Sequence, residues 1–287
     1  MKKFLRLALL FVLCFATDMT ISAGRILTDS IKSGILGVWV KYNVYLPNNY
    51  DIKSDTKYPI LYLLHGWSDD YTAWNVKGNM QFVADELMVS GESRKMLIVM
   101  PNGGTADIIN TWCGYFNMPG WEYADFFFKE FMPTVESKYH AIGDKGHRAV
   151  SGLSMGGGGS VVYCQMHPEL FSSCFAMSAW LDTPVTEISK EKSIKIYELK
   201  KAVHEHSASN FVKNADEETK KKLRTVAWFL DCGDDDILSD VCEEFHMTMR
   251  RANIPIEFRV RNGIHNWEYW HYSLRMALPF ISRNFDK

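Results

Sequence analysis

The sequence lacks an excess of charge of either sign. Its 287 residues include 32 Lys and Arg against 34 Asp and Glu, which gives a formal net charge of -2. A nucleic-acid-binding protein usually carries a basic patch or stripe, so this balance argues against nucleic acid as a partner. Hydrophobic residues make up 47% of the chain and charged residues 23%, which excludes a disordered or fibrous protein.

Long hydrophobic runs are missing after the N-terminal segment. Residues 1–6 are basic, residues 7–16 are almost entirely apolar, and Ala23 is a small residue suited to cleavage. The apolar run is too short to span a bilayer, so this layout predicts a secretory signal peptide over residues 1–23. We expect the mature chain, residues 24–287, to be secreted or periplasmic, with no stable insertion in a membrane.

Cysteine is scarce and follows no metal-binding pattern. Of the six Cys, Cys14 lies in the predicted signal, where the bulky Leu13 before it disfavours a lipoprotein. The other five are an odd number, and none has a CxxC or zinc-like spacing, so we expect no metal site. One disulfide is possible in an exported protein, and the sequence leaves its pair open. These five are Cys113, Cys164, Cys174, Cys232 and Cys242.

No linker rich in Ser, Gly or Pro and no internal repeat divides the chain. Instead, short continuous apolar runs, typical of parallel strands covered on both faces, alternate with helical patterns. The predicted strands are residues 38–46, where apolar and polar residues alternate, and the runs 58–64, 96–100, 148–152, 174–178, 226–230 and 256–260. The predicted helices are residues 80–89, 124–139, 157–167, 238–252 and 267–285. This alternation predicts one α/β domain with a mostly parallel, doubly wound sheet and helices on both faces.

One segment interrupts the alternation. Residues 182–224 contain no apolar strand and are rich in charged residues. We expect a helical insertion there. It could cap a functional site, or it could be a plain solvated excursion.

The pattern Gly152-Leu153-Ser154-Met155-Gly156 lies between a predicted strand and a predicted helix. In that context a Gly-x-Ser-x-Gly pattern is a nucleophile elbow, which presents the serine hydroxyl at the carboxyl end of the sheet. The flanking glycines keep Cβ atoms away from the crowded turn. We therefore predict Ser154 as a catalytic nucleophile.

A serine nucleophile needs a histidine base and a carboxylate that orients it, and in this order of elements both follow the serine. His265 lies in the loop after the last predicted strand, beside a glycine turn, and is our predicted base. The loop after the preceding strand offers Asp231, Asp234, Asp235 and Asp236. We favour Asp236, because the chain turns back there toward the next helix.

Ester hydrolysis builds negative charge on the carbonyl oxygen, which two backbone N–H groups should receive. One is the amide of Met155, directly after the nucleophile, and the other comes from the loop after the early strand. We assign the second to Trp67. His65 in the same loop is expected to hold the loop rather than to take part in the chemistry.

Together these segments resemble the esterase D superfamily of α/β hydrolases, from about Ile35 to the C-terminus. The resemblance is closest to the feruloyl and acetylxylan esterases of carbohydrate esterase family 1. It implies the α/β-hydrolase fold, with Ser154 as nucleophile, Asp236 as acid and His265 as base, and with the Trp67 and Met155 amides as the oxyanion hole. The segments that carry it are Leu-Leu-His65-Gly66, Gly152-Leu-Ser154-Met-Gly156-Gly157, Cys-Gly233-Asp-Asp-Asp236 and Gly263-Ile-His265-Asn-Trp267.

The resemblance implies an exported serine esterase, acting on plant cell-wall polysaccharide through an acyl-enzyme and needing no cofactor or metal. The substrate would be a small-molecule or polysaccharide-linked ester. A feruloyl ester is the favoured substrate, and an acetylxylan or short-chain carboxylesterase and an acyltransferase are the alternatives. A non-catalytic binding module is disfavoured by the intact set of catalytic residues.

Aromatic residues are plentiful, at 14% with 9 Trp. Most aromatic residues belong to a core, but a flat ferulate ring needs a slot with aromatic or apolar walls. The predicted substrate-binding residues are Trp67, Trp112, Tyr115 and Trp267.

Overall fold

A central sheet runs through the computed structural model, which describes residues 23–104, 107 and 110–287. The predicted signal peptide therefore lies, apart from Ala23, outside the described residues. The sheet strands are β1 (Arg25–Lys32), β2 (Trp39–Leu46), β3 (Ile60–Leu64), β4 (Leu97–Pro101), β7 (Arg148–Leu153), β8 (Ser173–Met177), β9 (Ala227–Gly233) and β10 (Glu257–Arg261). A separate short hairpin is made of β5 (Asn117–Met118) and β6 (Trp121–Glu122).

The eight strands follow the order β1-β2-β4-β3-β7-β8-β9-β10. Every pairing from β4 to β10 is parallel, whereas β1 and β2 run antiparallel at one edge. The predicted mostly parallel sheet is confirmed. β1 escaped prediction because it is an edge strand, where half-exposed polar residues such as Asp29 replace a continuous apolar run.

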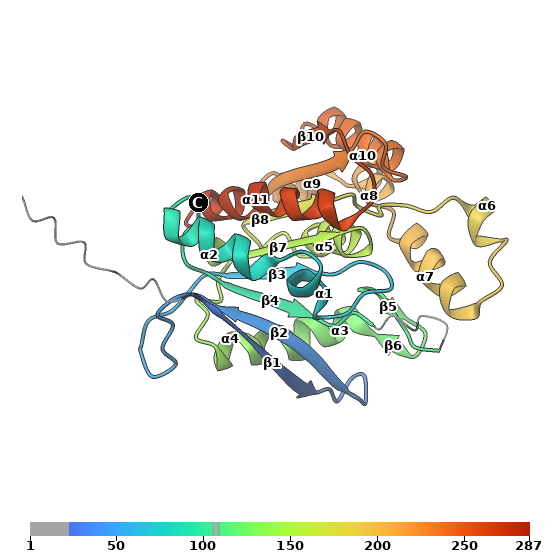
Figure 1. Ribbon diagram of the computed structural model, residues 1–287. Helices are drawn as coiled ribbons and strands as arrows, with labels where there is room; N and C mark the ends of the chain where they lie inside the picture. Colours follow the sequence, from blue (N-terminus) through green and yellow to red (C-terminus); the bar gives the residue numbers. More distant parts are fainter. Residues whose placement is uncertain (1–22, 105–106, 108–109) are drawn as a thin grey trace, which may run out of the picture.

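Helices cover both faces of the sheet (Figure 1). They are α1 (Ala73–Val76), α2 (Met80–Ser90), α3 (Tyr123–Phe126), α4 (Met132–Lys138), α5 (Met155–Met166), α6 (Val185–Ile188), α7 (Ile194–Glu205), α8 (Ala208–Asn214), α9 (Glu217–Leu223), α10 (Ser239–Arg251) and α11 (Trp267–Asn284). The predicted helix over residues 124–139 is interrupted, since a π-helical turn at Phe127–Phe131 separates α3 from α4. The other predicted helices agree with α2, α5, α10 and α11 to within a few residues.

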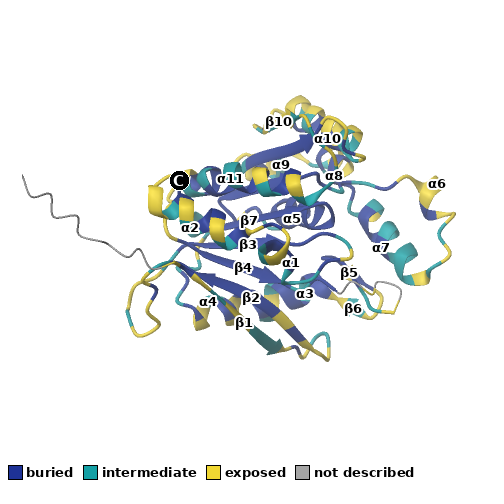
Figure 2. Ribbon diagram, in the orientation of Figure 1, coloured by how far each residue is buried: buried dark blue, intermediate teal, exposed yellow. Residues whose placement is uncertain are grey.

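The sheet separates two hydrophobic cores, because successive side chains of a strand point to opposite faces. In β3, Leu61 and Leu63 enter the core that also contains residues of α2 and α11. Tyr62 and Leu64 enter the other core, together with Tyr163 of α5. Figure 2 shows the resulting pattern, with buried strands between helices whose outer sides are exposed.

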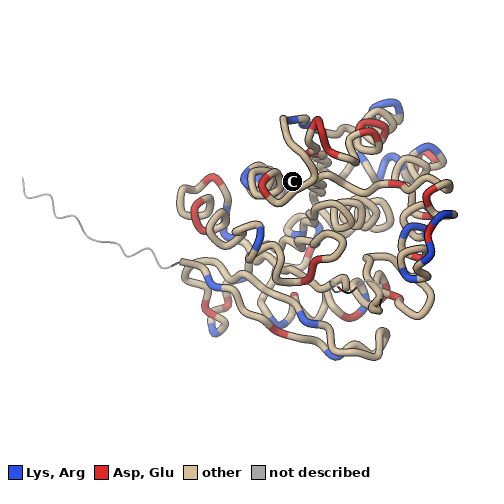
Figure 3. The backbone as a smooth tube through the Cα atoms, turned by 45° about the vertical axis from the view of Figure 1, so that its right-hand side comes forward, with Lys and Arg blue, Asp and Glu red and all other residues tan. Residues whose placement is uncertain are grey.

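The stretch from residue 182 to residue 224 forms α6, α7, α8 and α9 and contains no strand. Figure 1 shows α6 and α7 on the side of the sheet toward which the parallel strand arrows point. α7 contacts β5, and α8 contacts α5 and α10. Acidic and basic residues are interspersed along the chain rather than gathered by sign on one face (Figure 3). Within the described residues, no helix combines the length and the apolar character needed to cross a bilayer.

Candidate active site

Ser154 lies in a sharp turn between β7 and α5. Its backbone has φ 53° and ψ -118°, a conformation that residues other than glycine rarely adopt. A Cβ atom at Gly152 would lie 2.5 Å from the backbone of Gly156, and one at Gly156 would lie 2.5 Å from the carbonyl oxygen of His65. Both glycines are therefore needed for this turn. The Ser154 N–H donates to the Met177 carbonyl at 2.9 Å, which ties the turn to the end of β8.

The structure brings Ser154, His265 and Asp236 together in one hydrogen-bonded chain. Ser154 Oγ lies 2.9 Å from His265 Nε2. His265 Nδ1 lies 2.9 Å and 3.0 Å from the two carboxylate oxygens of Asp236. The side chain of Asp236 is fully buried and that of His265 is 20% exposed. With Nδ1–H donating to Asp236, Nε2 is free to accept the serine proton.

Several donors hold Asp236 in its ionised form. Burial alone raises the pKa of this carboxyl, but hydrogen bonds from His265, the Leu238 N–H and the Ser178 hydroxyl outweigh it. The pKa of Asp236 is consequently below its ordinary value of 3.8. An ionised carboxylate can stabilise the imidazolium that forms when His265 takes a proton.

The other candidate carboxylates have different contacts. Asp231 is buried in β9 and bonds Arg261, Tyr269 and the Ser273 hydroxyl. Asp234 accepts the Gly263 N–H at 2.9 Å and so ties the acid loop to the loop that carries His265.

Asp235 is exposed. The backbone N–H of Asp235 donates to the Gly263 carbonyl at 3.1 Å, which is a second hydrogen bond between the same two loops. Of the four aspartates proposed from the sequence, the one that contacts His265 is Asp236.

The loop after β3 is held by His65, as expected. The Nε2 atom of this buried histidine accepts the Gly103 N–H at 2.9 Å, so its proton lies on Nδ1 and donates to the Gly66 carbonyl at 2.8 Å. Burial lowers the pKa of His65, which keeps the ring neutral. Within the described chain, neither the Trp67 nor the Met155 backbone N–H has a protein acceptor. Both amides are thus free to receive a substrate oxygen.

The backbones of two tryptophan segments lie close to the nucleophile turn. A Cβ atom built at Gly66, the residue before Trp67, would be 3.6 Å from Ser154 Cβ. The backbone N–H of Trp180 donates to the Ser154 carbonyl at 2.9 Å. The Trp67 and Trp180 rings are 5.5 Å apart and tilted by 34°. Sequence reasoning missed Trp180, although its position just after the predicted strand 174–178 could have marked it.

The remaining predicted substrate-binding residues are dispersed. Tyr115 is wholly buried and its hydroxyl donates to the His65 carbonyl, so it supports the loop and presents no surface to a substrate. This corrects the expectation that it lines the rim, and the reason is that its ring points into the core.

Trp267 packs edge-on against Trp74 and Trp270, with ring centroids 5.3 Å and 5.4 Å away. Trp112 is half-buried, with the ammonium group of Lys195 from α7 5.3 Å from its ring centre. Within the described residues, neither ring makes a hydrogen bond or an aromatic ring contact with Ser154, His265 or Asp236.

No set of three or more His, Cys, Asp or Glu in the described part of the chain is placed to hold a metal ion. The cysteines of that part are buried thiols that form no disulfide with one another. The disulfide that the sequence allowed is therefore not formed among them.

Known esterases resemble this chain in sequence and in fold. Residues 33–281 match the model of the Esterase family, whose description is "Putative esterase". A solved structure named ferulic acid esterase is 46% identical, covers 92% of this chain and 99% of its own, and superposes with a TM-score of 0.87. The FphF serine hydrolase of Staphylococcus aureus, at 21% identity and 91% and 99% coverage, shares the fold with a TM-score of 0.75.

Among curated proteins, an endo-1,4-beta-xylanase/feruloyl esterase of Xylanibacter ruminicola is 32% identical over 184 residues. The match covers 63% of this chain and 25% of that protein, so the chain spans about a quarter of the length of this relative. The family match covers most of the chain, and the central sheet is the one found in esterases of the α/β-hydrolase fold. The resemblance to feruloyl esterases is thereby confirmed, and the chain belongs to the Esterase family of carboxylic ester hydrolases.

Proposed function

We propose that this chain is an exported feruloyl esterase that acts on plant cell-wall polysaccharide through an acyl-enzyme on Ser154. The observation that carries the proposal is the hydrogen-bonded chain from Ser154 through His265 to Asp236. The names of its relatives support the choice of ester, since a ferulic acid esterase and a xylanase/feruloyl esterase are both among them.

The first step transfers the acyl group to the enzyme. Ser154 Oγ attacks the ester carbonyl carbon while its proton moves to His265 Nε2, and the carbonyl electron pair becomes an oxyanion. The free N–H groups of Trp67 and Met155 would receive that oxyanion, each contributing about 3–4 kcal/mol of transition-state stabilisation. Collapse of the intermediate breaks the bond to the alcohol, which leaves with the proton from His265.

The second step returns the enzyme to its starting state. A water molecule gives a proton to His265 Nε2 and attacks the acyl carbon, and Ser154 then leaves with that proton. Asp236 remains ionised in both steps and stabilises the imidazolium through Nδ1. If a sugar hydroxyl replaced the water, the same enzyme would act as an acyltransferase.

The aromatic pair beside the nucleophile supports an aromatic acyl group. Trp180 is tied to the Ser154 carbonyl by its backbone N–H and its ring packs against that of Trp67, so this aromatic pair is our choice for the walls of the acyl site, which suit a cinnamoyl ring better than a methyl group. No such support exists for Tyr115, whose ring is enclosed in the core.

Export through a signal peptide over residues 1–23 is part of the proposal, as is a single domain over residues 24–287 with the helical insertion. Gly24 is buried, its N–H donates to Asp85, and its carbonyl accepts the side-chain amide of Gln81. The folded domain is thus anchored from Gly24 onward, directly after the proposed cleavage site.

The test is a hydrolysis panel with methyl ferulate, methyl p-coumarate, p-nitrophenyl acetate and p-nitrophenyl butyrate. Shape discrimination of this kind is worth about 1–3 kcal/mol, so we expect kcat/KM for methyl ferulate to exceed that for the acetyl ester roughly tenfold or more. A preference for acetate would move the function to the acetylxylan or short-chain alternative. Labelling by a serine-directed phosphonate at Ser154 checks the nucleophile independently of the substrate.

A further inference from the structure

Ser178 is a buried residue with an unusual backbone. It follows the last residue of β8 and has φ 43°, in the left-handed region that costs a non-glycine residue conformational energy. Its N–H donates to the Asp231 carbonyl at 2.7 Å. None of its surface is exposed, so its hydroxyl has to find its hydrogen-bond partners inside the protein.

The contacts of the Ser178 hydroxyl determine where its proton points. The Trp270 Nε1–H lies 3.0 Å from Ser178 Oγ. An indole N–H can only donate, so the hydroxyl oxygen is the acceptor in that bond. The hydroxyl keeps one proton of its own to donate, and its proximity to the Asp236 carboxylate is one of the causes that lower the pKa of that group.

Trp270 also contacts the histidine directly. Its indole is 5% exposed and meets the His265 ring edge-on, with ring centroids 4.9 Å apart and an interplanar angle of 89°. One α11 side chain thus touches His265 with its ring, while its N–H reaches Asp236 through Ser178.

We infer that Ser178 and Trp270 are positioning residues, which hold the Asp236 carboxylate and the His265 ring in register with Ser154. The inference rests on the proposed function, because it assigns these residues to the proposed triad. Trp270 orients the Ser178 hydroxyl, the hydroxyl directs one side of the carboxylate, and the carboxylate then presents both oxygens to His265 Nδ1 at 2.9 Å and 3.0 Å.

Ser178→Gly is the sharpest test, because glycine adopts a positive φ at no steric cost. The variant removes the hydroxyl and relieves the backbone, so we expect an unchanged or higher Tm. In metal sites, loss of a hydrogen-bond partner that orients a ligand typically costs about 10–100-fold. By analogy we expect a fall of about that size in kcat on methyl ferulate, with KM unchanged. The His265 Nδ1 proton should also shift in the proton NMR spectrum.

Ser173→Ala is the matched control. Ser173 is at the other end of the same strand, and its buried hydroxyl has no hydrogen-bond partner. Its removal deletes the same atom from β8 without touching Asp236. We expect kcat and the Nδ1 proton resonance to stay as in the wild type.

Two combined variants separate positioning from general support of the fold. In an Asp236→Asn background, Ser178→Gly should cause little further loss, because the carboxylate through which it acts is gone. In a Ser178→Gly background, Trp270→Phe should likewise add little to the loss of kcat, since phenylalanine keeps an aromatic ring against His265 and the N–H no longer has a hydroxyl to orient; the smaller ring should lower the Tm through the cavity that it leaves.

The inference is overturned if Ser178→Gly keeps the wild-type kcat. It is also overturned if the fold-loss in kcat of the double variant equals the product of the fold-losses of Ser178→Gly and Asp236→Asn. A lowered Tm that accounts for the lost activity would also overturn it. Ser154→Ala is run in parallel. If that variant keeps its activity, the proposed function itself is wrong, whereas an inactive Ser154→Ala beside a fully active Ser178→Gly removes this inference alone.

Discussion

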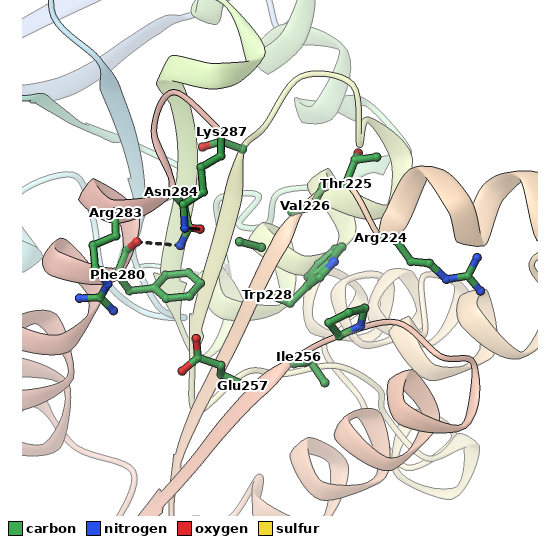
Figure 4. Close-up of a pocket in the computed structure, with 13 residues that line it drawn as sticks. Arg224, Thr225, Val226, Trp228, Ile256, Glu257, Phe280, Arg283, Asn284 and Lys287 are labelled. Atoms are coloured by element: carbon green, nitrogen blue, oxygen red, sulfur yellow. Dashed lines mark hydrogen bonds between the residues drawn. The ribbon is translucent and has the colours of Figure 1, made fainter.

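The two edges of the parallel sheet carry very different features. At the carboxyl edge, the loops after β7, β9 and β10 bring Ser154, Asp236 and His265 into one hydrogen-bonded chain. At the amino edge, the first residues of β9 and β10 border a pocket of about 470 Å³, which Arg224 and Arg283 also line (Figure 4). None of the three proposed catalytic residues lines that pocket.

The difference lies in which groups the polar side chains bring together. At the carboxyl edge a hydroxyl, an imidazole and a carboxylate bond to one another, and Ser154 and His265 are 111 positions apart. At the amino edge, Arg224 donates to the carbonyls of Ala252 and Asn253 and pairs with Glu217, and Asn284 donates to the carbonyl of Phe280. Side chains that satisfy nearby backbone groups stabilise the fold. The carboxyl edge differs from the amino-edge pocket because a nucleophile, a base and a carboxylate converge there.

The largest effect should come from removing the nucleophile. Ser154→Ala should lower kcat by about 10⁶-fold, since the acyl-enzyme cannot form. The Tm should be nearly unchanged, because the small hydroxyl contributes little to packing. Esterase assays and thermal unfolding of the same preparation check both. Retained activity, or phosphonate labelling at another residue, would place the reactive site elsewhere.

The next largest effect concerns the carboxylate. Asp236→Asn should lower kcat by about 10³–10⁴-fold, because the imidazolium loses its ionised partner. Asp235→Asn is the matched control in the same loop, and we expect a loss of roughly tenfold or less, because its side chain is exposed. Steady-state kinetics on methyl ferulate decide this. A damaging Asp235→Asn beside a mild Asp236→Asn would contradict the geometry.

A smaller effect distinguishes two tryptophans. Trp67→Ala keeps the backbone N–H but removes one proposed wall of the acyl site, so kcat/KM for methyl ferulate should fall about tenfold more than for p-nitrophenyl acetate. Trp267→Ala removes packing against Trp74 and Trp270 and should reduce both substrates equally. Selective loss of ferulate hydrolysis in the Trp267 variant would instead place its ring at the acyl site.

A pH effect on stability should also arise at the carboxyl edge. The folded pKa of Asp236 is below its ordinary value of 3.8, so the ionised carboxylate contributes stability well above that pH. The contribution is lost as the pH falls from there through the lower folded pKa. In urea unfolding at pH 6, pH 4 and pH 3, the free energy of unfolding should fall more steeply for wild type than for Asp236→Asn. Parallel slopes would show that Asp236 has no shifted pKa.

The smallest effect is expected at the amino edge. Arg283 is exposed at the pocket there, so Arg283→Ala should change the free energy of unfolding by no more than about 0.5 kcal/mol and leave kcat unchanged. Kinetics and urea unfolding measure both quantities. A clear loss of activity would show that the amino edge takes part in the reaction and would end the contrast between the two edges.

Much of the fold could be predicted because its signals are local. Continuous apolar runs marked the parallel strands from β3 to β10, and the glycines around Ser154 marked the turn. The half-exposed edge strand β1 has no such run, and the π-helical turn at Phe127–Phe131 leaves no mark in a periodic pattern. Both features depend on contacts between segments that are distant in the chain, and a local sequence pattern does not contain those contacts.

The sequence by itself determined the elbow serine, the loop of the base and the loop of the acid, because chain order and turn chemistry specify which loops end at the carboxyl edge. Only the tertiary structure decided which aspartate contacts His265 and which aromatic residues lie near the nucleophile turn. Tyr115 points into the core, while Trp180 contacts the nucleophile turn. Side-chain direction depends on packing between segments far apart in the chain, and that packing exists only once the sheet has formed.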